Sequence, residues 1–177
     1  MVISTEAPTR QTVPAVAAFT GAVLSAVAGA MQAVRPTDTD PLVDGGEHVM
    51  LTLVGLALVA WMPAYLALGR LTGSRLGAGL AVAGTALLAA AMTASNLNGE
   101  DYAWFPAIAV PANALWAAGS ILLAVAAWRR RTLPRPLAAA LPLIWLASIV
   151  LSQLGGNLIA AAVWAAVAWL AFTNRPR

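Results

Sequence analysis

The chain has 177 residues, of which 60% are hydrophobic and only 10% charged, whereas soluble domains carry roughly 25% charged residues. This composition argues against a soluble domain, because so few polar side chains cannot cover its surface, and it predicts contact with lipid. The net charge of +3 comes from ten arginines and no lysine. These arginines lie near the ends of predicted helices rather than in one patch, which argues against a nucleic-acid partner.

The chemistry available to the chain is limited by two residue types. There is no cysteine, and the single histidine is His48. Disulfides, thiolate nucleophiles and zinc–thiolate sites are therefore excluded, and a haem held by two histidines of one chain is impossible. We expect neither a cofactor nor a bound metal.

Apolar stretches long enough to cross a bilayer, about 17–25 residues, recur along the chain. The last apolar block, residues 137–172, is too long for one ordinary span, and Gly155-Gly156-Asn157 near its centre is a turn sequence. We therefore predict that this block forms a hairpin of two short helices. The six predicted spans are residues 13–34, 49–69, 76–95, 106–128, 137–153 and 157–172.

The charged residues separate by sign in this six-span arrangement. Nine of the ten arginines fall on one side of the membrane and six of the seven acids on the other. The positive-inside rule makes the arginine side cytoplasmic. The sequence thus predicts an all-α integral membrane protein, a six-helix bundle with short loops, formed by residues 1–177 as one domain with both termini cytoplasmic. The alanine excess and the use of arginine without lysine suggest a bacterium, and hence its cytoplasmic membrane.

The first span allows two further interpretations. Ala28-Gly29-Ala30 resembles a signal-peptidase site, and cleavage there would leave five spans with the same orientation. Gly21, Ser25 and Gly29 repeat at four-residue spacing, a pattern that lets helices approach closely. We expect the span to be retained, and these three residues are candidates for a contact between copies of the chain.

Known catalytic motifs of membrane enzymes are missing. Gly119-Ser120 is not followed by the glycine of an intramembrane serine protease, and Val49 and Thr52 replace the Glu and second His of a HExxH zinc site after His48. The predicted spans contain no Asp, Glu, Lys or Arg. This absence disfavours ion-coupled transport, which usually needs such a residue near the midplane.

Polar side chains gather instead in the outer third of the predicted bundle. Every span contributes an amide, a hydroxyl or the imidazole there, whereas the middle and inner layers hold only hydroxyls. Asn113 lies seven residues after Pro106, about 10 Å along the helix, where an amide needs a partner or water. We interpret the layer as a cup open to the outside. Its candidate catalytic residues are Glu47, His48, Glu100 and Asp101, and its candidate ligand-binding residues are Gln32, Asn96, Asn113, Trp116, Gln153 and Asn157.

Two classes of function fit this pattern. In the first, the cup binds or converts a lipophilic small molecule, with a rim carboxylate exchanging a proton and His48 tuning it, as in cyclases or isomerases. In the second, the protein is not catalytic and serves as a channel or permease subunit, an immunity factor or an assembly partner. A simpler interpretation also stands, in which the polar residues cap helices or join them and the tryptophans only pack.

Overall fold

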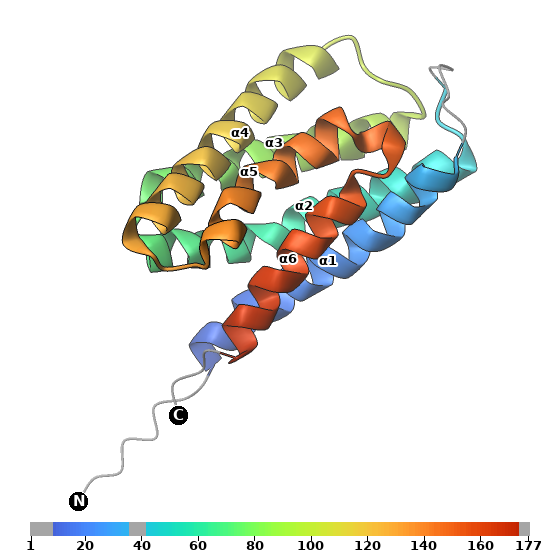
Figure 1. The fold of residues 1–177 in the computed structure, drawn as a ribbon. Helices are drawn as coiled ribbons and strands as arrows, with labels where there is room; N and C mark the ends of the chain where they lie inside the picture. The colour runs from blue at the N-terminus through green and yellow to red at the C-terminus, as the bar shows by residue number, and fades with distance from the viewer. Residues whose placement is uncertain (1–8, 36–41, 174–177) are drawn as a thin grey trace, which may run out of the picture.

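The chain folds into a bundle of α-helices that alternate in direction (Figure 1). This computed structural model describes residues 9–35 and 42–173, with side chains from residue 12 onward. Four long apolar helices are followed by two shorter ones, which confirms the predicted all-α class and the pair of short helices. The elements in the described part of the chain are α1 (Thr9–Val34), α2 (Gly45–Thr72), α3 (Arg75–Asn98), α4 (Phe105–Arg130), α5 (Arg135–Val150), the 3₁₀ turn η1 (Ser152–Leu154) and α6 (Asn157–Thr173).

The helices form a closed ring in chain order. Each helix packs against the next one in the sequence, and α6 packs against α1 to complete the circle. In Figure 1 α1 and α6 lie side by side, and the start of α1 and the end of α6 are at the same end of the bundle. A ring of six helices can enclose a central space, and its end that carries the α1–α2, α3–α4 and α5–α6 connections contains the site described below.

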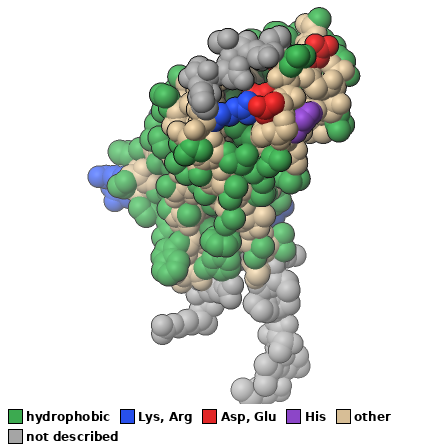
Figure 2. Space-filling view, turned by 90° about the vertical axis from the view of Figure 1, so that its right-hand side faces the viewer, with side chains coloured by type: hydrophobic (Ala, Val, Ile, Leu, Met, Phe, Trp, Pro, Cys, Tyr) green, Lys and Arg blue, Asp and Glu red, His purple; other side chains and the backbone are tan. Residues whose placement is uncertain are grey.

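Alanine is the commonest buried residue of this bundle, whereas many large apolar side chains lie on its surface. Most of the buried apolar residues are alanines, whereas every α-helix exposes large hydrophobic side chains, among them Leu76, Val110 and Trp169, each 69% exposed. Figure 2 shows a wide hydrophobic band on one face, with acidic side chains and His48 gathered at one end. Exposure of such an apolar surface to water is unfavourable, whereas contact with lipid is favourable. With four helices long and apolar enough to cross a membrane, the fold indicates a multi-pass membrane protein.

The small residues of α1 have a different role from the one predicted. Gly21, Ser25 and Gly29 are all buried within the chain. The Trp61 ring of α2 lies where a side chain on Gly21 would be, and a Cβ on Gly29 would come within 2.6 Å of the Leu158 backbone nitrogen of α6. The stripe therefore closes the ring between α1, α2 and α6, and it is not available for the predicted contact between copies.

The break between α5 and α6 depends on two glycines. Gly155 has a φ of 76°, in the left-handed region that favours glycine, and Gly156 packs so closely that a Cβ would overlap the Ala147 carbonyl oxygen. The turn lies where the sequence predicts it, but α5 ends at Val150 rather than at Gln153, because η1 replaces its last turn. The tight turn fixes the relative positions of the two helix ends that flank it.

With the exception of Arg35, charges of opposite sign occupy opposite ends of the ring. Asp44, Glu100 and Asp101 in the connections and Glu47 in the first turn of α2 are at the end where α2 and α4 begin. The predictions for Asp38, Asp40, Arg175 and Arg177 fall outside the described residues. Arginines occupy the turns at the other end, namely Arg70, Arg75, Arg129, Arg130, Arg131 and Arg135.

Candidate functional site

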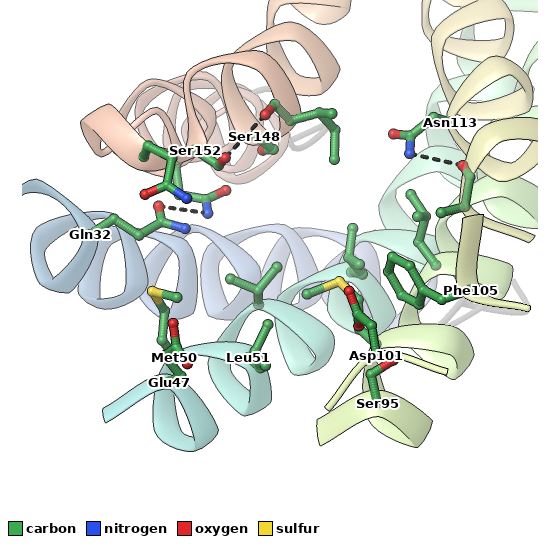
Figure 3. A pocket seen from close by; sticks show the side chains of 18 of the residues that line it. Gln32, Glu47, Met50, Leu51, Ser95, Asp101, Phe105, Asn113, Ser148 and Ser152 are labelled. Atoms are coloured by element: carbon green, nitrogen blue, oxygen red, sulfur yellow. Dashed lines mark hydrogen bonds between the residues drawn. The ribbon is translucent and has the colours of Figure 1, made fainter. Parts of the chain in front are cut away.

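A cavity of about 470 Å³ lies inside the ring, in the half that carries the acidic residues (Figure 3). Its lining includes residues from all six helices, the η1 turn and the two connections at this end. Along α2 it extends from Glu47 to Trp61, which is about 21 Å at 1.5 Å per residue. The lining changes with depth from charged groups, through amides and hydroxyls, to aromatic rings, and we call these layers the rim, the belt and the floor.

The rim is organised by Arg35 at the end of α1. Its guanidinium donates to both carboxylate oxygens of Asp44, at 2.7 and 3.2 Å, and lies 3.4 Å from a carboxylate oxygen of Glu47. Asp44 caps α2 by accepting from the Glu47 amide at 2.8 Å, and Glu47 accepts in return from the Asp44 amide at 3.2 Å. The Glu47 amide and, to a lesser extent, the Arg35 guanidinium lower the pKa of Asp44. The Asp44 carboxylate is therefore held in its ionised form and paired with a cation.

The second part of the rim is formed by the two connections. The Val43 amide donates to the Gly99 carbonyl at 2.8 Å, and Leu42 bridges to Glu100. Val43 and Asp101 both line the cavity. Because Asp101 and Gln153 line the cavity and are also exposed, the mouth opens to the outside of the bundle at this end.

The belt is built from amides and hydroxyls that face one another across the cavity. Asn157 at the start of α6 donates to Gln32 of α1 at 3.1 Å. Asn113 of α4 donates to the Ala109 carbonyl at 2.9 Å and accepts from Trp145 of α5 at 3.0 Å. Figure 3 shows Asn113 on the opposite side of the cavity from Ser148 and Ser152, the two serines near the α5–α6 turn.

Several polar atoms of the cavity lining have no partner within the described chain. They are the hydroxyls of Ser95 and Ser148, the Asn157 carbonyl oxygen and the Trp61 indole nitrogen, from residues that are 2%, 7%, 1% and 0% exposed. A buried polar group without a hydrogen bond costs about 1–3 kcal/mol. Water or a bound molecule in the cavity can supply the missing hydrogen bonds.

The floor is a cluster of fully buried aromatic rings. Trp61 and Trp116 line the cavity, with ring centroids 5.9 Å apart. Trp164 stacks on Trp61 at 5.6 Å, and Tyr65 meets Trp164 edge to face at 4.9 Å. The Trp116 indole donates to the Tyr65 hydroxyl at 2.7 Å, which satisfies its polar edge. The rings close the cavity at its inner end and fill the bundle beneath it.

The residues predicted as catalytic fall into two groups. Glu47 and Asp101 line the cavity, whereas His48 and Glu100 do not belong to its lining. His48 and Glu47 have different partners: the Nδ1 of His48 pairs with the Asn96 side chain at 2.7 Å, while Glu47 pairs with Arg35. Asn96 also donates to Thr52 at 3.0 Å, so this group joins α2 to α3. Of the residues predicted to bind a ligand, Asn96 thus lies apart, and the cavity brings together Gln32, Asn113, Trp116, Gln153 and Asn157.

Sequence reasoning missed Arg35 and Ser148. Arg35 is the only one of the ten arginines that the six-span topology places among the acids. This exceptional position could have been used to predict an ion pair between Arg35 and the nearby carboxylates. Ser148 is one of many small residues in an apolar helix, and nothing in its sequence neighbourhood distinguishes it. Among the described residues, no group of three or more His, Asp or Glu side chains could hold a metal ion.

Comparisons with known proteins do not assign the chain to a family. No family model matches the chain, and no curated protein or solved structure matches it. Function must therefore be argued from the geometry of the cavity.

Proposed function

We propose that the protein binds a lipophilic small molecule in the cavity, from the outer face of a bacterial cytoplasmic membrane. The observation that carries the proposal is the cavity itself, about 470 Å³ with an aromatic floor and unpartnered buried polar atoms in its wall. Ligand sites in proteins are typically concave and mostly apolar, with a few polar groups that orient the ligand. This cavity has both features.

The proposed membrane placement has six spans with both termini in the cytoplasm. It rests on the separation of arginines and acids to opposite ends of the ring and on the positive-inside rule. The two short helices have 16 and 17 residues, about 24–26 Å, and the η1 turn adds to the length of their hairpin. In this placement the mouth faces the outside, and ligands can enter from the outer leaflet or the external medium.

Binding is better supported than catalysis by the arrangement of the ionisable groups. His48 is held by Asn96 away from the cavity lining, and Glu47 is committed to Arg35 and to the cap of α2. Acid–base conversion of the ligand would then depend on Asp101 or Glu47 at the rim. A channel is disfavoured, because the buried rings of Trp61, Trp116 and Trp164 fill the space beneath the cavity.

The proposal is tested by native mass spectrometry of the protein purified from its own membrane. We expect a bound molecule on the wild type. Ala109→Phe should remove it, because Ala109 lines the cavity and a phenyl ring there fills the space. Ala118→Phe is the matched control, since Ala118 lies on the same helix but on the exposed surface. Equal occupancy in both variants, or no bound molecule on the wild type, would contradict the proposal.

A further inference from the structure

We infer that the ligand is an apolar molecule with a neutral hydroxyl, such as a long-chain or isoprenoid alcohol, bound with its apolar end on the tryptophan floor. This inference rests on the proposed function and specifies the chemistry and orientation of the ligand. Its hydroxyl would lie in the belt, against Ser148 and Asn157. Four features of the cavity lead to this assignment.

The first feature is the shape of the cavity. The cavity has a volume of about 470 Å³ and extends about 21 Å along α2. One extended hydrocarbon chain can follow an elongated cavity of this kind toward the floor.

The second feature is the position of the unpartnered polar atoms. Ser148 and Asn157 lie on either side of the α5–α6 turn, and both are more than nine-tenths buried. Asn157 donates to Gln32, which is one helical turn below Arg35 of the rim. The missing hydrogen bonds of these two residues are therefore in the belt, deeper than the charged groups. A ligand hydroxyl can donate to the Asn157 carbonyl oxygen and accept from the Ser148 hydroxyl, which makes it a suitable partner for both.

The third feature is the lack of formal charge among the described residues of the belt. The charged residues of the cavity lining are Arg35, Glu47 and Asp101, and all belong to the rim. A carboxylate, phosphate or ammonium group in the belt would lose its hydration without gaining a counterion, which is costly in a low-dielectric space. The group that reaches the belt must therefore be neutral.

The fourth feature sets the orientation. Trp61 and Trp116 are fully buried at the closed end of the cavity. The Trp116 indole nitrogen donates to Tyr65, and the edge of the Trp61 ring that carries its unpartnered indole nitrogen lies against Gly21 of α1. The floor thus offers apolar ring faces to the ligand. The apolar end of the ligand belongs there, and its hydroxyl points toward the mouth, as in a lipid of the outer leaflet.

The test uses decanol brominated at its far end, because bromine quenches tryptophan fluorescence on contact. Binding to the purified protein in nanodiscs should be saturable above the background seen with Ala109→Phe. Decanol brominated beside the hydroxyl should quench less than the end-labelled isomer, and this difference should disappear in the Trp61→Phe, Trp116→Phe double variant. The end-brominated decanoic acid and decylamine should bind at least tenfold more weakly than the alcohol.

Ser148→Ala gives the test of the belt. It should weaken decanol binding about fivefold, the effect of one neutral hydrogen bond, without lowering the melting temperature of the ligand-free protein, since the lost hydroxyl has no partner there. Ser25→Ala is the control, because Ser25 is an equally buried hydroxyl that does not line the cavity.

The outcomes separate the two proposals. Saturable binding with a preference for the acid or the amine, the reverse quenching order, or unchanged affinity in Ser148→Ala would overturn the inference and leave a lipophilic ligand in place. If none of the three probes bound above the Ala109→Phe background, the inference would be overturned as well. A purified wild type that also lacked a bound molecule in mass spectrometry would then overturn the proposed function itself.

Discussion

Replacing Gly155 with alanine should destabilise the protein strongly, through both its backbone conformation and its close packing on α1. The residue has a φ of 76°, a conformation that costs an L side chain about 1–2 kcal/mol. A Cβ would also lie 2.8 Å from the Ala33 Cβ and 2.9 Å from the Gly29 carbonyl oxygen of α1. Overpacking of this kind costs about 1–3 kcal/mol. We therefore expect a loss of about 2–5 kcal/mol in the free energy of unfolding.

This loss can be measured by unfolding the protein in mixed micelles with increasing SDS. Gly79→Ala is the matched control: Gly79 lies inside α3, is exposed, and a Cβ added there would meet no atom within 4 Å. Alanine is the better helix former there, by up to about 1 kcal/mol, so the control should be neutral or stabilising. If Gly155→Ala were as stable as Gly79→Ala, the tight packing of the α5–α6 turn on α1 would be refuted, and with it the fixed position of Ser148 and Asn157.

Three further predictions concern other parts of the structure. In intact cells a cysteine replacing Ser74 should be shielded from impermeant thiol reagents and one replacing Asn98 should react; the reverse pattern would invert the topology. Asp44→Ala should lower the melting temperature and Asp44→Asn should restore most of it, because an amide oxygen also caps a helix. Because the pKa of Asp44 is lowered in the folded state, its contribution is complete above the ordinary value of 3.8 and is lost as the pH falls below it, which thermal unfolding at several pH values would show. Asn96→Leu should cost about 1–3 kcal/mol of stability by unpairing His48, but should leave decanol affinity unchanged; a loss of affinity would place Asn96 in the site.

The helices could be predicted from the sequence because membrane helices depend on simple quantities. Apolar length identified the four long helices, and Gly155-Gly156 identified the break between the two short ones. Packing between helices was harder to predict. Small residues at four-residue spacing indicate close approach but not the partner, and Gly21 and Gly29 approach α2 and α6 of the same chain. The close contact of α3 and α4 at Gly84 and Gly119 left no comparable signal.

The candidate site could be predicted as a layer but not in detail. Sorting polar residues by depth placed Gln32, Asn113, Gln153 and Asn157 near one another, and all four line the cavity. Depth carries no information on the direction in which a side chain points around its helix. His48 and Asn96 share the level of the cavity but bond to each other between α2 and α3, whereas Ser148 faces inward.

The most direct test of a lipophilic ligand in this cavity is an experimental structure of the protein purified from its own membrane in nanodiscs. We predict one elongated feature of density that starts on the rings of Trp61 and Trp116 and reaches the hydroxyl of Ser148 and the side chain of Asn157. A cavity that contains only separate water positions, or one closed by its own side chains, would contradict the proposed binding function.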